Sequence, residues 1–152
     1  DGRLRTRKTH ATRHERVLWL SKPGGDAYFN PVAMATKYTE EQKKVARQKG
    51  AGRLREDSLT IGKPPWSWWT TPRVNSNSSE RRHGSHPSMK PLEVARRLIL
   101  AHSPPDGLVV IPFAGSGSEL VECARAGDLR CVAFEIDQKY ANITKKRVAA
   151  LA

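Results

Sequence analysis

Two glycines and one carboxylate are the residues of this chain best suited to hold a nucleoside. Gly115 and Gly117 follow an apolar run, and because they lack a Cβ, a ligand can approach the backbone at the start of the next helix. Glu135 lies 20 residues after Gly115, at the end of a second apolar run, where a carboxylate can accept hydrogen bonds from two ribose hydroxyls. The spacing favours a nucleoside site, and a purely structural turn is the alternative.

The glycine turn does not match the common phosphate-binding loops. No Gly-Lys-Ser/Thr follows it, so it is not a P-loop, and Leu120 stands where a dinucleotide fingerprint has its third Gly or Ala. A nucleoside without a pyrophosphate therefore fits this turn better than a dinucleotide does. Half of a nicotinamide- or nucleotide-binding oxidoreductase stays open as an alternative function.

The elements around the turn must place these residues at one edge of a sheet. A helix is predicted to begin at Lys90-Pro91 and to bury one face, which carries Pro91, Val94, Ala95, Leu98 and Ile99. The run 108–111 predicts a strand covered on both faces, and 130–136 predicts a second buried strand. The helix between them should run to Ala126, with Leu120, Val121 and Ala124 inward, Ser116 and Glu119 as a capping box and Gly127 as its stop.

After the second strand, Asp137 can cap a last helix with Tyr140, Ile143, Val148 and Leu151 on one face. The order strand, glycine turn, helix, strand, helix is half of a doubly wound α/β sheet, which binds ligands at the carboxyl ends of its strands. Upstream, 16–20 has the composition of a strand, 40–48 that of a short exposed helix, and 62–85 that of an irregular segment. Trp66, Trp68 and Trp69 could stack on bases, although packing in a core or turn is the favoured interpretation.

Charge divides the chain into two parts. Residues 1–90 hold 19 Lys and Arg against 8 Asp and Glu, whereas residues 91–152 hold 8 against 7, within a total net charge of +12. The first part predicts contact with a polyanion, with a solubilising surface as the alternative, and the second has the charge of an ordinary neutral fold.

Other features exclude some classes of protein. No stretch approaches the ~18 consecutive apolar residues of a membrane span. Two cysteines, Cys123 and Cys131, are too few for a disulfide scaffold or a four-cysteine zinc site, and they favour a reducing compartment. No metal site is expected. Because the chain starts at Asp1 without Met or an apolar signal, we expect a processed, truncated or cut chain, not a secretory precursor.

Three motifs in one order resemble the C-terminal portion of the N6-adenine/N4-cytosine DNA amino-methyltransferases, in the class whose cofactor motifs follow the catalytic motif. These motifs are His-Pro-Ser-Met-Lys-Pro at 86–91, Pro-Phe-Ala-Gly-Ser-Gly-Ser at 112–118 and Phe-Glu-Ile at 134–136, and the resemblance covers 86–152 without a gap. A looser resemblance covers 3–32, where His14 and Glu15 precede Val-Leu-Trp-Leu-Ser-Lys and Tyr-Phe-Asn.

The resemblance implies an α/β, Rossmann-like methyltransferase sheet and S-adenosylmethionine as the cofactor. In that case 113–118 would wrap the cofactor near its methionine part, Glu135 would hold the ribose hydroxyls with Ile136 beside the adenine, and 86–90 would close the methionine end. His14 and Glu15 would lie near the target-base pocket. The implied cofactor-binding residues are His86, Ser88, Lys90, Pro112, Phe113, Ala114, Gly115, Ser116, Gly117, Ser118, Glu135 and Ile136.

This chain departs from the family pattern at two places. Ile111 stands where the family has an Asp, and an apolar residue cannot accept a hydrogen bond from the cofactor's ammonium, so some other group must. The family's catalytic tetrad, Asp, Asn or Ser followed by Pro-Pro and an aromatic residue, is not found. The nearest match is Lys63-Pro64-Pro65-Trp66, but lysine has only donors and cannot accept from an amino group. The catalytic residues are therefore unknown, and we expect the tetrad upstream of Asp1.

Together these observations predict a portion of a site-specific DNA methyltransferase acting on the exocyclic amino group of adenine or cytosine, with a non-catalytic, methylase-like DNA-binding module as the alternative. The expected divisions are 1–35, a pocket-rim strand and loop; 36–85, a basic target-recognition or connecting segment; and 86–152, the cofactor half.

The expected partner is double-stranded DNA, with no membrane, in a bacterial or phage-encoded cytoplasmic setting. A missing N-terminal part, or another chain, should complete the sheet because the catalytic strand lies outside these residues. The expected DNA-binding residues are Lys43, Lys44, Arg47, Arg53 and Arg55.

Overall fold

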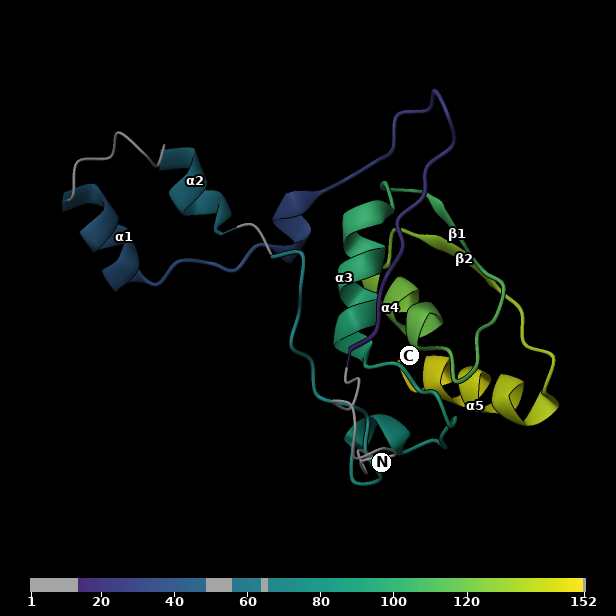
Figure 1. Ribbon diagram of the computed structural model, residues 1–152. Helices are drawn as coiled ribbons and strands as arrows, with labels where there is room; N and C mark the ends of the chain where they lie inside the picture. Colours follow the sequence, from purple (N-terminus) through teal and green to yellow (C-terminus); the bar gives the residue numbers. More distant parts are fainter. Residues whose placement is uncertain (1–13, 49–55, 64–65, 152) are drawn as a thin grey trace, which may run out of the picture.

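The chain builds one layered α/β body, from which a pair of short helices stands apart (Figure 1). The computed structural model describes residues 14–48, 56–63 and 66–151. Two of the expected DNA-binding residues, Arg53 and Arg55, and the two prolines at 64–65 lie outside these residues. No helix in the described ranges has the length and apolar character needed to cross a membrane.

The sheet consists of two parallel strands, β1 (Leu108–Ile111) and β2 (Arg130–Ala133), paired in the register Leu108 to Arg130 and Ile111 to Ala133. β1 consists of Leu, Val, Val and Ile, and β2 has Cys, Val and Ala after Arg130. The prediction for 108–111 is therefore confirmed. The strand predicted over 130–136 ends at Ala133, because the chain turns there into the loop that carries Glu135.

Only one face of the sheet is covered within the described chain. Side chains of adjacent residues alternate between faces, and the face of Leu108, Val110 and Val132 is open, with relative exposures of 55%, 54% and 43%. The expectation of strands buried on both faces is thus wrong here. The reason is that helix α4 packs on the opposite face, and no described helix packs on this one.

Three helices form the covered side: α3 (Leu92–His102), α4 (Ser118–Ala126) and α5 (Gln138–Ala149). Helix α4 contacts both strands and is itself contacted by α3 and α5 (Figure 1). The buried apolar residues of this layer are Ala95, Ile99, Ala101, Ile111, Val121, Cys123 and Ile143. Burial raises the pKa of the Cys123 thiol, so this cysteine behaves as a packed apolar group.

The helix ends follow the sequence in most respects. Asp137 caps α5 by accepting a hydrogen bond from the Lys139 N–H at 2.8 Å, and Gly127 ends α4 with a positive φ of 79°. Two expectations for α4 are wrong. Ala124 is exposed, since the inward face is made by Val121 and Cys123, and the capping box does not form because Gly117 is the N-cap.

The N-terminal part of the described chain has little regular structure. Residues 16–20 form no strand, and Leu18 and Leu20 are 80% and 86% exposed, because the described chain places no neighbouring strand beside them. A short 3-10 helix, η1 (Pro31–Met34), packs against α3. Beyond it, α1 (Glu40–Gln48) has the bounds that the sequence predicts, and α2 (Glu56–Ile61) follows.

Helix α1 has no buried residue and stands away from the sheet together with α2 (Figure 1). A single antiparallel bridge between Thr36 and Lys63 joins the two ends of this helical pair. The charged face of α1 is thus presented to solvent and contributes nothing to the core.

The segment 66–85 is irregular, as expected, apart from a short 3-10 helix, η2 (Ser79–Arg81). The interpretation of packed indoles is wrong for Trp66 and Trp68, which are 76% and 68% exposed. Trp69 is partly buried, and its ring lies 5.4 Å from the Arg97 guanidinium.

Candidate functional site

The site is built on the turn between β1 and α4. Gly115 and Gly117 both have positive φ, 55° and 75°. A Cβ at Gly117 would lie 2.4 Å from Thr144 Cγ2, so glycine is required there for space as well as for conformation. At Gly115 a Cβ would lie 3.6 Å from the His86 ring, an ordinary van der Waals contact, so the positive φ alone favours glycine there.

Glu135 lies where the spacing predicts, beside the glycine turn at the carboxyl ends of both strands. Its Oε2 accepts a hydrogen bond from the Gly115 N–H at 2.7 Å, and its Oε1 accepts one from the Asp137 N–H at 2.9 Å. These two bonds fix the carboxylate at the edge of the turn. Ile136, the next residue, is fully exposed.

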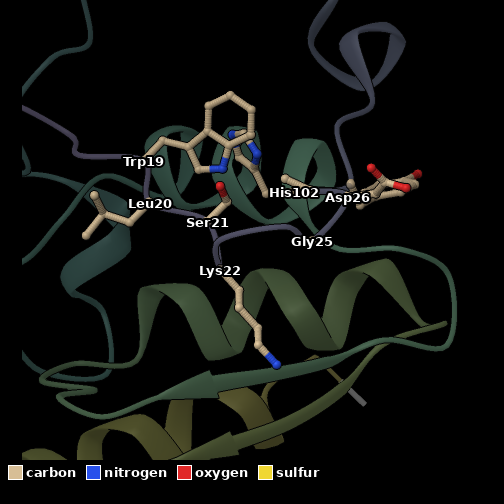
Figure 2. A pocket seen from close by; sticks show the side chains of 9 residues that line it. Trp19, Leu20, Ser21, Lys22, Gly25, Asp26 and His102 are labelled. Carbon is tan, nitrogen blue, oxygen red and sulfur yellow. The ribbon is translucent and has the colours of Figure 1, made fainter.

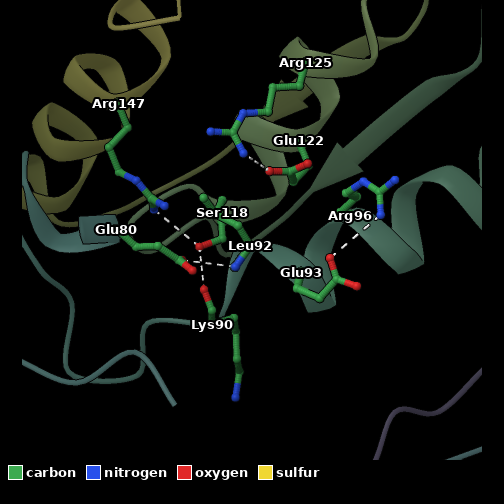
Figure 3. Close-up of polar contacts among 9 residues, drawn as sticks. All are labelled: Glu80, Lys90, Leu92, Glu93, Arg96, Ser118, Glu122, Arg125 and Arg147. Carbon is green, nitrogen blue, oxygen red and sulfur yellow. Dashed lines mark hydrogen bonds and ion pairs between the residues drawn. The ribbon is translucent and has the colours of Figure 1, made fainter. Parts of the chain in front are cut away.

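Helix α5 holds the turn from behind through two polar side chains. Arg147 is only 4% exposed, and its Nη1 donates to the Ser116 carbonyl at 2.6 Å and to the Ser116 hydroxyl at 3.2 Å. The same Nη1 donates to the Ser118 hydroxyl at 3.3 Å (Figure 3). Thr144 Oγ1 donates to the Gly115 carbonyl at 3.2 Å. Burial lowers the pKa of Arg147, although the electrostatic attraction of the Glu80 carboxylate opposes this effect.

Sequence reasoning missed Thr144 and Arg147. The helical face of Ile143 was identified from apolar residues alone, and Thr144 and Arg147 continue that buried face one and four residues later. A polar pair at spacing i, i+3 on a buried face was the signal that could have found them.

A cleft of about 230 Å³ opens beside the turn. Its lining includes most of the residues expected to bind a cofactor: His86, Ser88, Lys90, Phe113, Ala114, Gly115, Ser116 and Ser118, with Glu119 in addition. The structure brings the segment 86–90 and the glycine turn together, as the resemblance implies. Pro112, Gly117, Glu135 and Ile136 do not line this cleft, so any ligand that also reached Glu135 would extend past Gly115.

The 86–90 segment is itself held in place. The His86 ring lies 4.3 Å from the Tyr140 ring, and its Nδ1 accepts a hydrogen bond from the Ser88 N–H at 3.1 Å. The Lys90 carbonyl accepts a hydrogen bond from Ser118 Oγ at 2.8 Å (Figure 3). These contacts connect the 86–90 segment to α4 and to α5.

Two contacts join the site to more distant segments. The Lys90 ammonium pairs with the Glu15 carboxylate, which brings the residues of the looser resemblance to the cleft. His14 is exposed. On the other side, Glu80 of η2 accepts a hydrogen bond from the Leu92 N–H at 3.0 Å (Figure 3).

A second cleft, of about 350 Å³, lies among the N-terminal residues and the end of α3. Figure 2 shows the Trp19 indole against His102, with ring centroids 5.2 Å apart, and Phe29 lies 5.3 Å from the same imidazole. Within the described residues, His102 Nδ1 is buried without a hydrogen-bond partner. The lining is aromatic and mixed, and it contains none of the residues expected to bind a cofactor.

The described basic residues expected to contact DNA lie on α1, far from the cleft (Figure 1). Lys43 pairs with Glu40 at 2.7 Å, and this hydrogen bond lowers the pKa of the Glu40 carboxyl. Lys44 and Arg47 are exposed on the same helix. The described residues contain no group of three His, Cys, Asp or Glu side chains that could hold a metal ion.

Comparison with known proteins supplies a second line of observation. A family model described as DNA methylase matches residues 4–146. The chain is similar to the type II methyltransferase M.ScaI of Streptomyces caespitosus, with 33% identity over 150 residues, 97% of this chain and 47% of that protein. It is also similar to the type II methyltransferase M.BglII of Bacillus subtilis, with 29% identity over 92% of this chain and 37% of the relative.

The chain thus spans less than half the length of these two relatives. Among solved structures, the cytosine-N4-specific PvuII DNA methyltransferase is 22% identical over 55% of this chain and 32% of that one, with a TM-score of 0.48. The complex of M1.HpyAVI with SAM is 27% identical over 57% of this chain and 42% of that one, with a TM-score of 0.44.

Proposed function

Because the chain belongs to the N6/N4 family of DNA methylases, we propose that it is the cofactor-binding portion of an enzyme that methylates DNA. The reaction would transfer a methyl group from S-adenosylmethionine to the exocyclic amino group of adenine or cytosine in a base flipped out of the duplex. The observation that carries this proposal is the Glu135 carboxylate, held against the Gly115 N–H at the carboxyl ends of β1 and β2.

The residues of the site fit S-adenosylmethionine. The cleft lined by Gly115 lets a ligand approach the turn, and the fixed carboxylate of Glu135 suits ribose hydroxyls. The cleft behind the turn, lined by Ser88, Lys90 and Ser116, would hold the methionine end. When bound, the cofactor supplies an electrophilic methyl group on its sulfonium. The protein residues described above bind and orient it, and Arg147 keeps the turn in shape.

The charge of the chain supports DNA as the partner. The 19 basic residues in 1–90 exceed the acidic ones by 11, and α1 carries part of that excess on a helix with no buried residue. We propose that 36–85 is the target-recognition segment, that 1–35 lines the rim of the base pocket and that 86–152 is the cofactor half. Such an enzyme would act on bacterial or phage DNA in the cytoplasm.

The catalytic residues and the remaining strands are proposed to lie outside these 152 residues. The outer edge of β1 has no strand beside it in the described chain, and the face of Leu108 and Val110 is bare. Unpaired backbone groups at this edge and exposed apolar side chains on this face both favour contact with a further protein segment. The length of the relatives supports a missing N-terminal part of the same polypeptide as the segment that completes the sheet, with a separate chain as the other source.

The cofactor proposal is tested by calorimetry with S-adenosylmethionine and with NAD. We expect binding of the first and none of the second, because Leu120 occupies the position at which a dinucleotide loop needs a small residue. Methyl transfer is then tested on duplex DNA with the longest polypeptide that contains these residues. Binding of NAD alone would contradict the proposal.

A further inference from the structure

One carboxylate in the cleft has no hydrogen bond or ion pair with any residue that the structure describes. Glu119 is the second residue of α4 and lines the cleft beside the glycine turn. The sequence suggests that it caps the helix together with Ser116, but the Ser116 hydroxyl is bonded to Arg147. Among the described residues, no hydrogen bond or ion pair reaches the Glu119 carboxylate. A charged acceptor is therefore left facing the cleft.

The other carboxylates around the site are already engaged. Glu135 accepts from two backbone N–H groups, Glu122 pairs with Arg125 at 2.6 Å, and Glu80 accepts from the Leu92 N–H. Glu15 pairs with Lys90. Of the residues that line the cleft, Glu119 is the one that carries a carboxylate.

The end of β1 supplies no acceptor of this kind. Its last residue, Ile111, is apolar and only 7% exposed, and it packs on the covered side of the sheet. The cleft thus holds one anionic side chain, Glu119, and one cationic side chain, Lys90, whose ammonium also pairs with Glu15. A pair of opposite charges in one cleft suits a ligand end that is itself a zwitterion, with one ammonium and one carboxylate.

We propose that Glu119 accepts hydrogen bonds from the α-ammonium of the methionine end of S-adenosylmethionine, with Lys90 facing the α-carboxylate. This inference rests on the proposed function, because it takes the ligand from it. It assigns to Glu119 the role of selecting ligands with a zwitterionic amino-acid group over ligands in which that group is neutral or carries only a carboxylate.

A second role for Glu119 is distinguishable. A carboxylate in the first turn of a helix also stabilises that helix through its dipole. That role predicts that removing the charge lowers stability and leaves the choice of ligand unchanged. Discrimination between ligands with and without the amino group is therefore the decisive readout.

The experiment measures, by calorimetry on the whole purified chain, the affinity for S-adenosylhomocysteine and for its analogue in which hydrogen replaces the α-amino group. The unmodified chain should prefer the amino-bearing ligand by about 10- to 100-fold, as expected for a charge-assisted hydrogen bond. Glu119→Gln should reduce this preference to about threefold or less. Glu93→Gln, which removes an exposed carboxylate on α3, should leave it unchanged.

Methylthioadenosine, which has the nucleoside but no amino-acid group, provides the check on folding and should bind the unmodified chain and Glu119→Gln equally. If Glu119→Gln keeps the full preference, or if it loses methylthioadenosine as well, the inference about Glu119 is wrong while the proposed function stands. If the unmodified chain binds none of the three nucleosides, the proposed function itself fails.

Discussion

At the scale of single residues, Glu135 is the group on which the proposed nucleoside site depends. Glu135→Ala removes the acceptor at the edge of the glycine turn and should weaken the binding of S-adenosylmethionine by about 1.5–3 kcal/mol, the range for a hydrogen bond to a charged group. Calorimetry measures the effect. Asp128→Asn, an exposed acid in the turn before β2, is the control. An unchanged affinity in Glu135→Ala would remove this residue from the site.

The contacts of Glu135 and Arg147 differ in how far the sequence could predict them. Glu135 is found because its distance from Gly115 follows from a regular strand–helix–strand unit. The contact of Arg147 could not be predicted in this way, because a charged residue near the end of a basic helix is usually solvated. Only the three-dimensional structure shows its guanidinium bonded to Ser116. Contacts that follow from a periodic sequence pattern can therefore be predicted. Contacts between side chains that only the three-dimensional fold brings together cannot.

At the scale of elements, α5 acts as the support of the glycine turn. Arg147→Ala should lower the free energy of unfolding by about 1.5–3 kcal/mol, because the Ser116 carbonyl and its neighbours lose a buried charged donor. Urea denaturation measures this loss, and Lys146→Ala, an exposed neighbour on the same helix, should change little. Equal stabilities of the two variants would show that Arg147 does not hold the turn.

Helix α1 should act as an electrostatic contact with duplex DNA. If its basic residues meet phosphates, the logarithm of affinity falls with the logarithm of salt concentration by about 0.9 for each contact. Reversing the charge of Lys43, Lys44 and Arg47 should flatten that slope. Reversing Lys145 and Lys146 on α5 is the control for net charge. A flat response in the unmodified chain would mean that the basic excess is only a solvated surface.

Elements could be predicted where the local pattern is strong. The residues of α1 and of β1 match the structure, since a run of polar helix-forming residues and a short run of Leu, Val and Ile carry strong local signals. The run 16–20 has a similar composition but is not a strand, because strand formation needs a neighbouring backbone to pair with, and composition does not report one.

At the scale of the whole molecule, the open edge of β1 predicts that residues 1–152 alone do not transfer methyl groups. A polypeptide that adds the proposed further strands and the proposed catalytic tetrad should do so. Radiolabelled S-adenosylmethionine with duplex DNA measures both. Transfer by the 152-residue chain would contradict this, and it would place the catalytic acceptor within the chain, with Lys63-Pro64-Pro65-Trp66 as the first segment to test.

The layer order could be predicted from the sequence, whereas the bare face of the sheet could not. Apolar strands such as 108–111 are typical of sheets covered on both sides, and the sequence does not say which protein segment provides the second cover. The exposure of Leu108 and Val110 shows that the part of the chain described by the structure covers one side. The resemblance to part of a family predicts which segment would cover this face better than the hydrophobicity of the strand does.

The isolation of α1 has a consequence for proteases. A helix with no buried residue opens locally at little cost in free energy, and the peptide bonds after Lys43, Lys44 and Arg47 are those that trypsin cleaves. Brief digestion should therefore nick α1 well before it reaches the body of α3, α4 and α5. If the proposed function is right, the nicked protein should still bind S-adenosylmethionine while its affinity for DNA falls, so proteolysis would separate the two proposed binding activities.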